Sequence, residues 1–411
     1  MFLLIWLVSG SIVSSSSPAY GEPVHLPLIR QVLSHSDSAV SRSLLGVERR
    51  NRADEQYLIP ISLGTPTQII PLVLSFNDPG TIVVGCNLDS KSCSSSVGTE
   101  TLFNYSDSSS AQNKSTSMQT ITPLGAAPIP GSVFTDVIGF GPFSVLDASF
   151  FVIQNYSGAT ASATFGLGFP DASFQNLPSI WQSLLSTNPV DAPEMGIWLS
   201  RLHNTSGLGV FTFGGTNSSL YTGDIEFLNS TSTSFWALNI TTLTIQGREI
   251  TLTQSRNNNV IFEVAATGIY GPISSVAAIW AQVPGASPIP NHPGAYQYPC
   301  STALHISVSF GGRSWTLDPA ELNGGSHQTD WNFGQPFLRG VYTVLRQGSP
   351  PQIGFADLSE QGDGASSGSA SLPPSSTAPP RSTPPPVSAR ASPVAAVYLW
   401  PADVNDRTAQ S

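Results

Sequence analysis

The sequence is poor in charged residues and in cysteine. Only 10% of its 411 residues are charged, against about 25% in typical soluble proteins. Sixteen Lys and Arg stand against 26 Asp and Glu, which gives a net charge of -10. Because nucleic-acid binding requires a dense basic surface, this balance excludes a nucleic-acid partner. Three cysteines are too few for a disulfide-dense scaffold or a cysteine-based zinc cluster.

Long apolar runs are also missing. No segment approaches the roughly twenty apolar residues that a membrane-spanning helix requires, so no transmembrane span is expected. The six histidines are scattered, and no metal-binding spacing or glycine-rich phosphate loop occurs. We therefore expect no metal and no cofactor. Ser75 lacks the G-x-S-x-G turn of a hydrolase nucleophile.

Short runs of β-branched and aromatic residues fill residues 55–357. They alternate with Gly- and Pro-containing turns, a pattern typical of all-β sandwiches and barrels. Because about 300 residues exceed the usual size of one β core, we expect two lobes, residues 55–228 and 229–357. Helical patterns are confined to residues 177–186, residues 273–283 and the surroundings of Phe337.

Both ends of the chain are predicted to lie outside these lobes. Residues 1–21 contain the apolar run FLLIWLV followed by small residues, which is typical of a secretory signal peptide. Residues 22–54 are predicted to be a pro-segment, in which Arg49-Arg50 is either a processing site or an ordinary basic surface patch. The tail, residues 358–411, is rich in Ser and Pro and cannot bury enough apolar surface to fold.

Seven N-x-Ser/Thr sequons predict a glycosylated surface and agree with a secreted, extracellular protein, associated with a cell wall if the tail acts as a stalk. They begin at Asn104, Asn113, Asn155, Asn204, Asn217, Asn229 and Asn239.

Six segments of the chain form an ordered set of motifs: Tyr57 to Gln68, Phe165 to Phe169, Val210 to Asp224, Phe235-Trp236, Trp331 to Arg339, and Val341-Tyr342 with Ile353 to Ala356. In this order they resemble secreted fungal aspartic proteases of the pepsin-like A1 family. The resemblance covers about residues 55–357 and implies a bilobal all-β fold with a few short helices. It also implies a cleft that binds a peptide beneath a hairpin flap.

Active members of that family place one Asp of an Asp-Thr/Ser-Gly loop in each lobe. The two carboxyl groups share a proton and activate a water molecule. Counting from the matched Gln68 puts Ser75-Phe76-Asn77 at the first loop, and Glu263 stands at the second catalytic position. Because a hydroxyl cannot share a proton as a carboxylate does, the resemblance implies that no intact catalytic pair remains.

Two alternatives stay open at these loops. Asp78, in the stretch Asp78-Pro79-Gly80-Thr81, serves as the first carboxylate if three residues are inserted before the loop. Otherwise it is a turn residue before Pro-Gly. Glu263 is either a catalytic carboxylate or a retained polar group, hydrogen-bonded at the cleft floor or turned to solvent.

The resemblance carries two further expectations. Leu124, followed by Gly125, lies where the family places Tyr-Gly at the tip of the flap, so this flap lacks the tyrosine hydroxyl. Cys86 and Cys93 match the family's small disulfide, which suits an oxidising compartment. Cys300 has no later cysteine as a partner, so we expect a buried free thiol or an intermolecular bond.

The leading hypothesis is a secreted, monomeric pseudoprotease of the pepsin fold that keeps its cleft for a peptide or protein ligand. The first alternative is an active acid endopeptidase that uses Asp78 and Glu263. The second alternative, from a different functional class, is a stalked cell-wall binding protein or an inhibitor.

Overall fold

The structure is a computed structural model. It describes residues 21–33, 54–86, 96–97, 100–122, 128–153, 163–170, 177–187, 190, 192–201, 208–252, 258–290, 296–299, 301–319, 321, 324–326, 331–360 and 394–397. The flap tip at Leu124-Gly125, Cys93 and Cys300 lie outside these residues, so the predictions made for them stay predictions.

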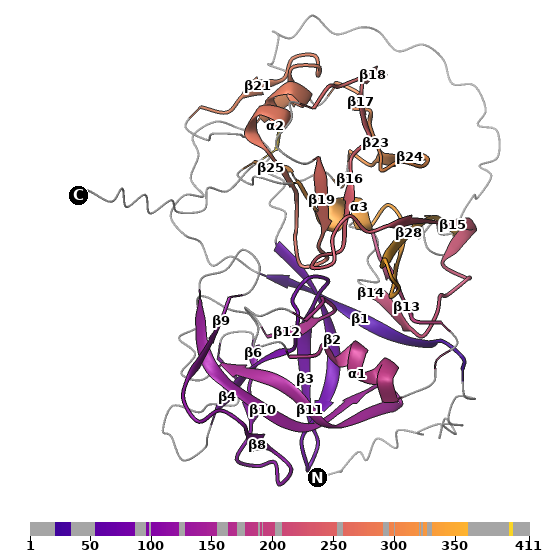
Figure 1. The fold of residues 1–411 in the computed structure, drawn as a ribbon. Helices are drawn as coiled ribbons and strands as arrows, with labels where there is room; N and C mark the ends of the chain where they lie inside the picture. The colour runs from indigo at the N-terminus through magenta and orange to yellow at the C-terminus, as the bar shows by residue number, and fades with distance from the viewer. Residues whose placement is uncertain are drawn as a thin grey trace, which may run out of the picture.

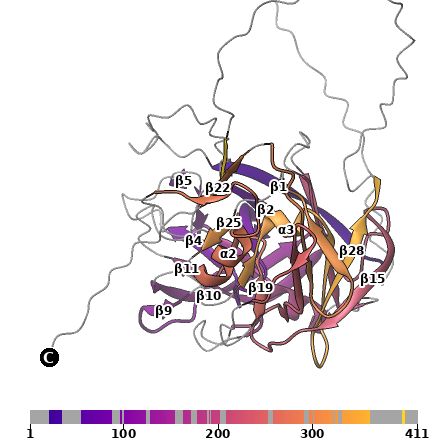
Figure 2. The same cartoon turned by 90° about the horizontal axis from the view of Figure 1, so that it is seen from above.

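A 15-stranded sheet forms the N-terminal half and continues toward the C-terminal half (Figure 1). Seen from above, β15 and β28 lie on one side of the molecule and β4, β10 and β11 on the other (Figure 2). The strands are β1 Val24–Leu33, β2 Asp54–Leu63, β3 Gln68–Ser75, β4 Ile82–Cys86, β7 Phe103–Asn104, β8 Gln112–Asn113, β9 Gln119–Ile121, β10 Ile129–Phe140, β11 Phe143–Ile153, β12 Thr164–Gly166, β13 Glu194–Leu199, β14 Leu208–Phe213, β15 Tyr221–Asn229, β27 Tyr342–Arg346 and β28 Gln352–Leu358.

Smaller sheets make up most of the C-terminal half, with one two-stranded sheet in the N-terminal half. The five-stranded sheet contains β16 Ala237–Asn239, β19 Asn259–Phe262, β20 Ile269–Gly271, β25 Gly324–Ser326 and β26 Trp331–Phe333. The others contain β17 Thr242–Ile245, β18 Arg248–Glu249, β23 Ile306–Ser309 and β24 Ser314–Leu317; β21 Ser287–Pro288, β22 Tyr296–Pro299 and β29 Val394–Val397; and β5 Ser96–Val97 with β6 Glu100–Thr101.

The described residues contain three short helices, α1 Ile180–Thr187, α2 Ile273–Trp280 and α3 Gln335–Leu338. Each lies where the sequence indicated helix, and the rest of the described chain is strand, turn or loop. The all-β fold class with a few short helices is therefore confirmed.

Strand β1 is a departure from the sequence-based expectation. Residues 22–54 were expected outside the lobes, yet β1 lies between β14 and β2 within the large sheet. It pairs antiparallel with both, and Leu28 is fully buried. The reason is local: the run VHLPLI offers β-branched and apolar residues that satisfy two open strand edges at once. Cleavage at Arg49-Arg50 stays a prediction.

Three other strands pair across the predicted boundaries. Strand β27 pairs with β13, and β28 pairs with β15, so the last strands of the C-terminal half complete the sheet of the N-terminal half. Within the predicted tail, β29 pairs with β22. The large sheet thus ties the two halves together beneath the site described below.

The two halves repeat one local strand arrangement, around β3 in one half and β19 in the other. In the N-terminal half β3 runs parallel to β12, which is antiparallel to β4. In the C-terminal half β19 runs parallel to β26, which is antiparallel to β20. Each half therefore sends one strand into a loop at the centre of the molecule, and that loop crosses closely over a neighbouring strand end.

Glycine permits each of these crossings. A Cβ atom at Gly166 would collide with the carbonyl oxygens of Asp78 and Gly80, and one at Gly334 with those of Ala266 and Gly268. Asp78 and Gly80 follow Ser75 by three and five residues, and Ala266 and Gly268 follow Glu263 by the same intervals. Ser75 and Glu263 therefore occupy equivalent places in the two halves.

We predict that Gly166→Ala and Gly334→Ala each destabilise the fold. The new methyl group meets backbone oxygens, which cannot rotate away as a flexible side chain can, so the free energy of unfolding should fall by about 2–3 kcal/mol or more. Urea unfolding of each variant measures this. A loss below about 0.5 kcal/mol in both variants would contradict the close crossing.

Candidate active site

Ser75 and Glu263 meet at the centre of the molecule. Ser75 is the last residue of β3, and Glu263 directly follows β19. The Ser75 hydroxyl donates a hydrogen bond to Glu263 Oε2 at 3.1 Å. Both residues are buried, with 3% and 8% of their surface exposed. The structure thus brings together the two positions that the motif spacing predicted for the catalytic loops.

The Glu263 carboxylate accepts five hydrogen bonds. Oε1 accepts from the Phe76 N–H at 3.0 Å and the Ala265 N–H at 2.9 Å. Oε2 accepts from Ser75 Oγ, from the Asn77 N–H and from Asn77 Nδ2, each at 3.1 Å. A carboxylate offers about four lone-pair sites, so these donors occupy its accepting capacity.

Asn77 joins the two halves of the protein, a role that the motif did not predict. Its Nδ2 also donates to the Phe262 carbonyl at 2.7 Å, and its Oδ1 accepts from the Trp236 N–H at 3.0 Å. One side chain of the N-terminal half therefore holds two backbone segments of the C-terminal half. The only sequence signal was an amide in place of the expected Gly, which does not reveal a contact 185 residues away.

Asp78 lies beside this cluster. Its backbone N–H donates to Ser75 Oγ at 3.1 Å, and its carboxyl group is buried. Among the described residues, Ser75 Oγ stands between Asp78 and Glu263, and no direct hydrogen bond joins the two carboxyl groups. Asp78 is equivalent to Ala266 in the other half, not to Glu263.

Burial governs the ionisation of both acids. The pKa of Asp78 is raised from 3.8 to about 7, chiefly by burial and also by the negative charge of Glu263, while hydrogen bonds with Thr164 and Ser75 act in the opposite direction. Burial also raises the pKa of Glu263, while its N–H donors oppose that rise. Five donors favour the charged form of Glu263, so Asp78 is the acid that keeps its proton.

Sequence comparison now adds to this geometry. The family model described as eukaryotic aspartyl protease matches residues 56–358, most of the chain. The chain belongs to the eukaryotic aspartyl protease family.

Several curated proteins are similar to this chain over most of the same region. The major aspartyl peptidase 1 of Cryptococcus neoformans is 28% identical over 78% of this chain and 71% of the relative. Cathepsin D of Dictyostelium discoideum is 25% identical over 74% of the chain and 83% of the relative. Human gastricsin is 25% identical over 74% and 81%.

The remaining predicted features fall on the surface of this aspartyl protease fold or outside the described residues. Five sequons are described: Asn113, Asn229 and Asn239 are exposed, while Asn104 and Asn217 are partly exposed. Asn155 and Asn204 lie outside the described residues.

None of the described helices has the length and hydrophobicity needed to cross a membrane.

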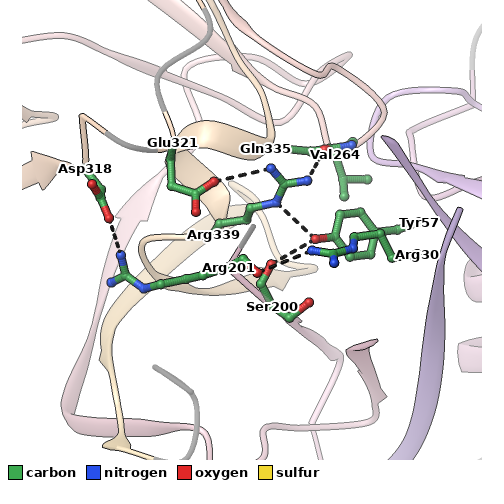
Figure 3. Close-up of polar contacts among 9 residues, drawn as sticks. All are labelled: Arg30, Tyr57, Ser200, Arg201, Val264, Asp318, Glu321, Gln335 and Arg339. Carbon is green, nitrogen blue, oxygen red and sulfur yellow. Dashed lines mark hydrogen bonds and ion pairs between the residues drawn. The ribbon is translucent and has the colours of Figure 1, made fainter. Parts of the chain in front are cut away.

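A buried ion pair supports the C-terminal loop of the site (Figure 3). Arg339 Nη1 lies 3.3 Å from Glu321 Oε2, and Arg339 Nη2 donates to Gln335 Oε1 at 2.7 Å. Gln335 Nε2 in turn donates to the Val264 carbonyl at 3.0 Å. Since Val264 directly follows Glu263, this chain of contacts fixes the backbone that carries the carboxylate.

The same arginine reaches the N-terminal half. Arg339 Nε donates to Tyr57 Oη at 3.1 Å, and Tyr57 Oη donates to the Ser200 carbonyl at 3.1 Å. Nearby, Arg30 of β1 donates to the Arg201 carbonyl at 3.3 Å (Figure 3). The loop of Glu263 is therefore linked through Arg339 and Tyr57 to β2 and to Ser200, which follows β13.

We predict that Asp78 makes the protein less stable as the pH rises from about 4 to 7. The folded state keeps the Asp78 proton up to a pKa of about 7, whereas the unfolded chain releases it near 3.8. Stability is therefore greatest below the unfolded pKa and is lost as pH rises through the folded one, by up to roughly 4 kcal/mol.

Urea unfolding at pH 4 and pH 7 tests this expectation. Asp78→Asn should reduce the difference between the two pH values, although Glu263 leaves part of it because its pKa is raised in the same direction. The exposed Asp224→Asn serves as the control. A wild type that is more stable at pH 7 than at pH 4 would show that the proposed proton is not retained.

We also predict a large cost for breaking the buried ion pair. Glu321→Gln should lower the free energy of unfolding by about 3–5 kcal/mol, because the buried Arg339 guanidinium loses the charge of its Glu321 partner. The matched control is Asp357→Asn. It removes a partner of Arg313 in an exposed pair, with side chains 64% and 42% exposed, and should cost less than about 1 kcal/mol. Equal losses in denaturant unfolding would refute the special role of the buried pair.

Proposed function

We propose that this aspartyl protease family member is a secreted peptide-binding protein that does not hydrolyse peptides. The observation that supports this most is the saturated carboxylate of Glu263 facing a hydroxyl at Ser75. Hydrolysis by the family's chemistry needs one ionised and one protonated carboxyl group around a water molecule. Ser75 offers no carboxyl group, and Glu263 has no free lone pair with which to deprotonate water.

The equivalence of the two halves supports the positions in this proposal. Gly166 and Gly334 place Ser75 and Glu263 in register at the two strand ends. This register supports Ser75 and Glu263 as the family's catalytic positions, without an insertion. Asp78 then stands at the fourth position of its loop, where its buried carboxyl group interacts with Thr164 and Ser75.

The strand framework around the site supports retention of a ligand-binding face. Strands β9 and β10 pair as a hairpin on either side of the segment that carries Leu124, and the buried ion pair holds the opposite loop. The exposed sequons at Asn113, Asn229 and Asn239 support the secretory part of the proposal.

A second candidate is an acid endopeptidase that uses Asp78 and Glu263. One observation favours it: the charge of Glu263 raises the pKa of Asp78, so the two carboxyl groups are electrostatically coupled, as a proton-sharing pair must be. Against it stand the intervening Ser75 hydroxyl and the occupied lone pairs of Glu263.

A protease assay separates the two candidates. The full chain and the chain cleaved after Arg50 are incubated with acid-denatured protein between pH 2 and 6, with and without a pepsin-family inhibitor. We expect no inhibitor-sensitive cleavage, because removal of a catalytic unit lowers rates by orders of magnitude. An active member of the family is the positive control.

The variants Asp78→Asn and Glu263→Gln define the contrary outcome. Inhibitor-sensitive cleavage by the wild type that both substitutions abolish would establish the endopeptidase and refute the proposal. Binding of peptides or of the inhibitor, measured by calorimetry, tests the ligand-binding half of the proposal independently of cleavage.

A further inference from the structure

Asn332 carries a polar group that no residue in the described part of the chain satisfies. It lies in β26 and is only 8% exposed. Its Oδ1 is fully buried and has no hydrogen-bond partner among the described residues. An unpaired buried amide is costly, and native proteins rarely keep one without a reason. The remaining exposed surface leaves one edge of the side chain accessible.

Strand pairing places Asn332 on the same face as Glu263. Asn332 is in register with Ile261 of β19 and with Tyr270 of β20. Its neighbour Phe333 packs in the core, 6.2 Å from the ring of Phe262. Because strand side chains alternate, Asn332 and Ile261 occupy the opposite, partly exposed face.

Glu263 lies on the same face of the sheet as Ile261 and Asn332. Its N–H donates to the Phe333 carbonyl at 3.1 Å, so the parallel ladder extends one residue beyond β19. Glu263 is two residues after Ile261 and therefore shares its side of the sheet, about 6.5 Å along the strand. In a peptide bound across the site, the residue that meets Asn332 would therefore be one or two positions from the residue that meets Ser75 and Glu263.

We propose that Asn332 forms a subsite for a neutral hydrogen-bonding side chain, that of Ser, Thr or Asn, in a peptide bound across Ser75 and Glu263. This inference rests on the proposed peptide-binding function. Rotation of the amide presents either its oxygen or its NH2 group at the exposed edge, so the ligand group can donate or accept. Ile261 and Tyr270 provide partly exposed apolar flanks. The amide itself is uncharged and the Glu263 carboxylate is already satisfied, so a charged ligand side chain gains nothing here.

The experiment uses octapeptides in which single positions carry near-isosteric pairs: Thr or Val, Asn or Leu, and Ser or Ala. Binding to the full chain is measured by calorimetry at pH 5. At one position we expect the polar member of each pair to bind roughly tenfold more tightly, the effect of one buried hydrogen bond. Asn332→Leu should abolish or reverse that preference while leaving the other positions unchanged.

Control variants keep the outcome decisive. Gln352→Leu makes the same kind of amide-to-apolar change in a different sheet and should retain the preference. Asn332→Leu should unfold at the same or a higher urea concentration than wild type, because it removes an unpaired amide; if it does not fold, Asn332→Ala replaces it in the binding assay.

Each alternative result overturns a defined statement. Binding without a polar preference, or a preference that survives Asn332→Leu, overturns the subsite and leaves the peptide-binding function intact. Absence of binding by any peptide overturns both. A marked loss of stability in Asn332→Leu together with unchanged binding would assign Asn332 a structural role instead.

Discussion

The carboxylate of Glu263 is the point on which the centre of this protein depends. Four of its five hydrogen bonds come from Ser75, Phe76 and Asn77 of the opposite half. A buried carboxylate without partners would cost several kcal/mol or would take up a proton. Here each oxygen is satisfied across the boundary between the halves. The group that the family's chemistry would use on a water molecule instead joins the two halves.

Ser75 makes that arrangement possible. A carboxylate at Ser75 would face Glu263 directly, and two such groups cannot both ionise without sharing a proton. A hydroxyl donates to one carboxylate and accepts from the Asp78 N–H at the same time. The acid of this loop is Asp78, three residues after Ser75, and burial keeps it protonated at acid pH. The centre thus holds one satisfied charge and one neutral acid.

The fold was largely predictable from local pattern. Alternating β-branched runs predicted the strands, and three short helices lie where their apolar periodicity indicated. Strand β1 was missed because a segment that fills two open sheet edges has the same composition as one that does not. The meeting of Ser75 and Glu263 followed from motif spacing. The bridging role of Asn77 and the unpaired amide of Asn332 did not, since both depend on pairing between residues far apart in the chain.

Two sets of hydrogen bonds hold the short loop that contains Glu263 and Val264. Donors of the N-terminal half hold the side chain of Glu263, while Gln335 and Arg339 hold the carbonyl of Val264 next to it. A general base must be free to accept a proton from a water molecule as the reaction proceeds. The occupied lone pairs of Glu263 and the buried ion pair near its backbone both support the proposal that it is not a catalytic base. Under that proposal, the interactions that stabilise the centre are the same ones that oppose its use in catalysis.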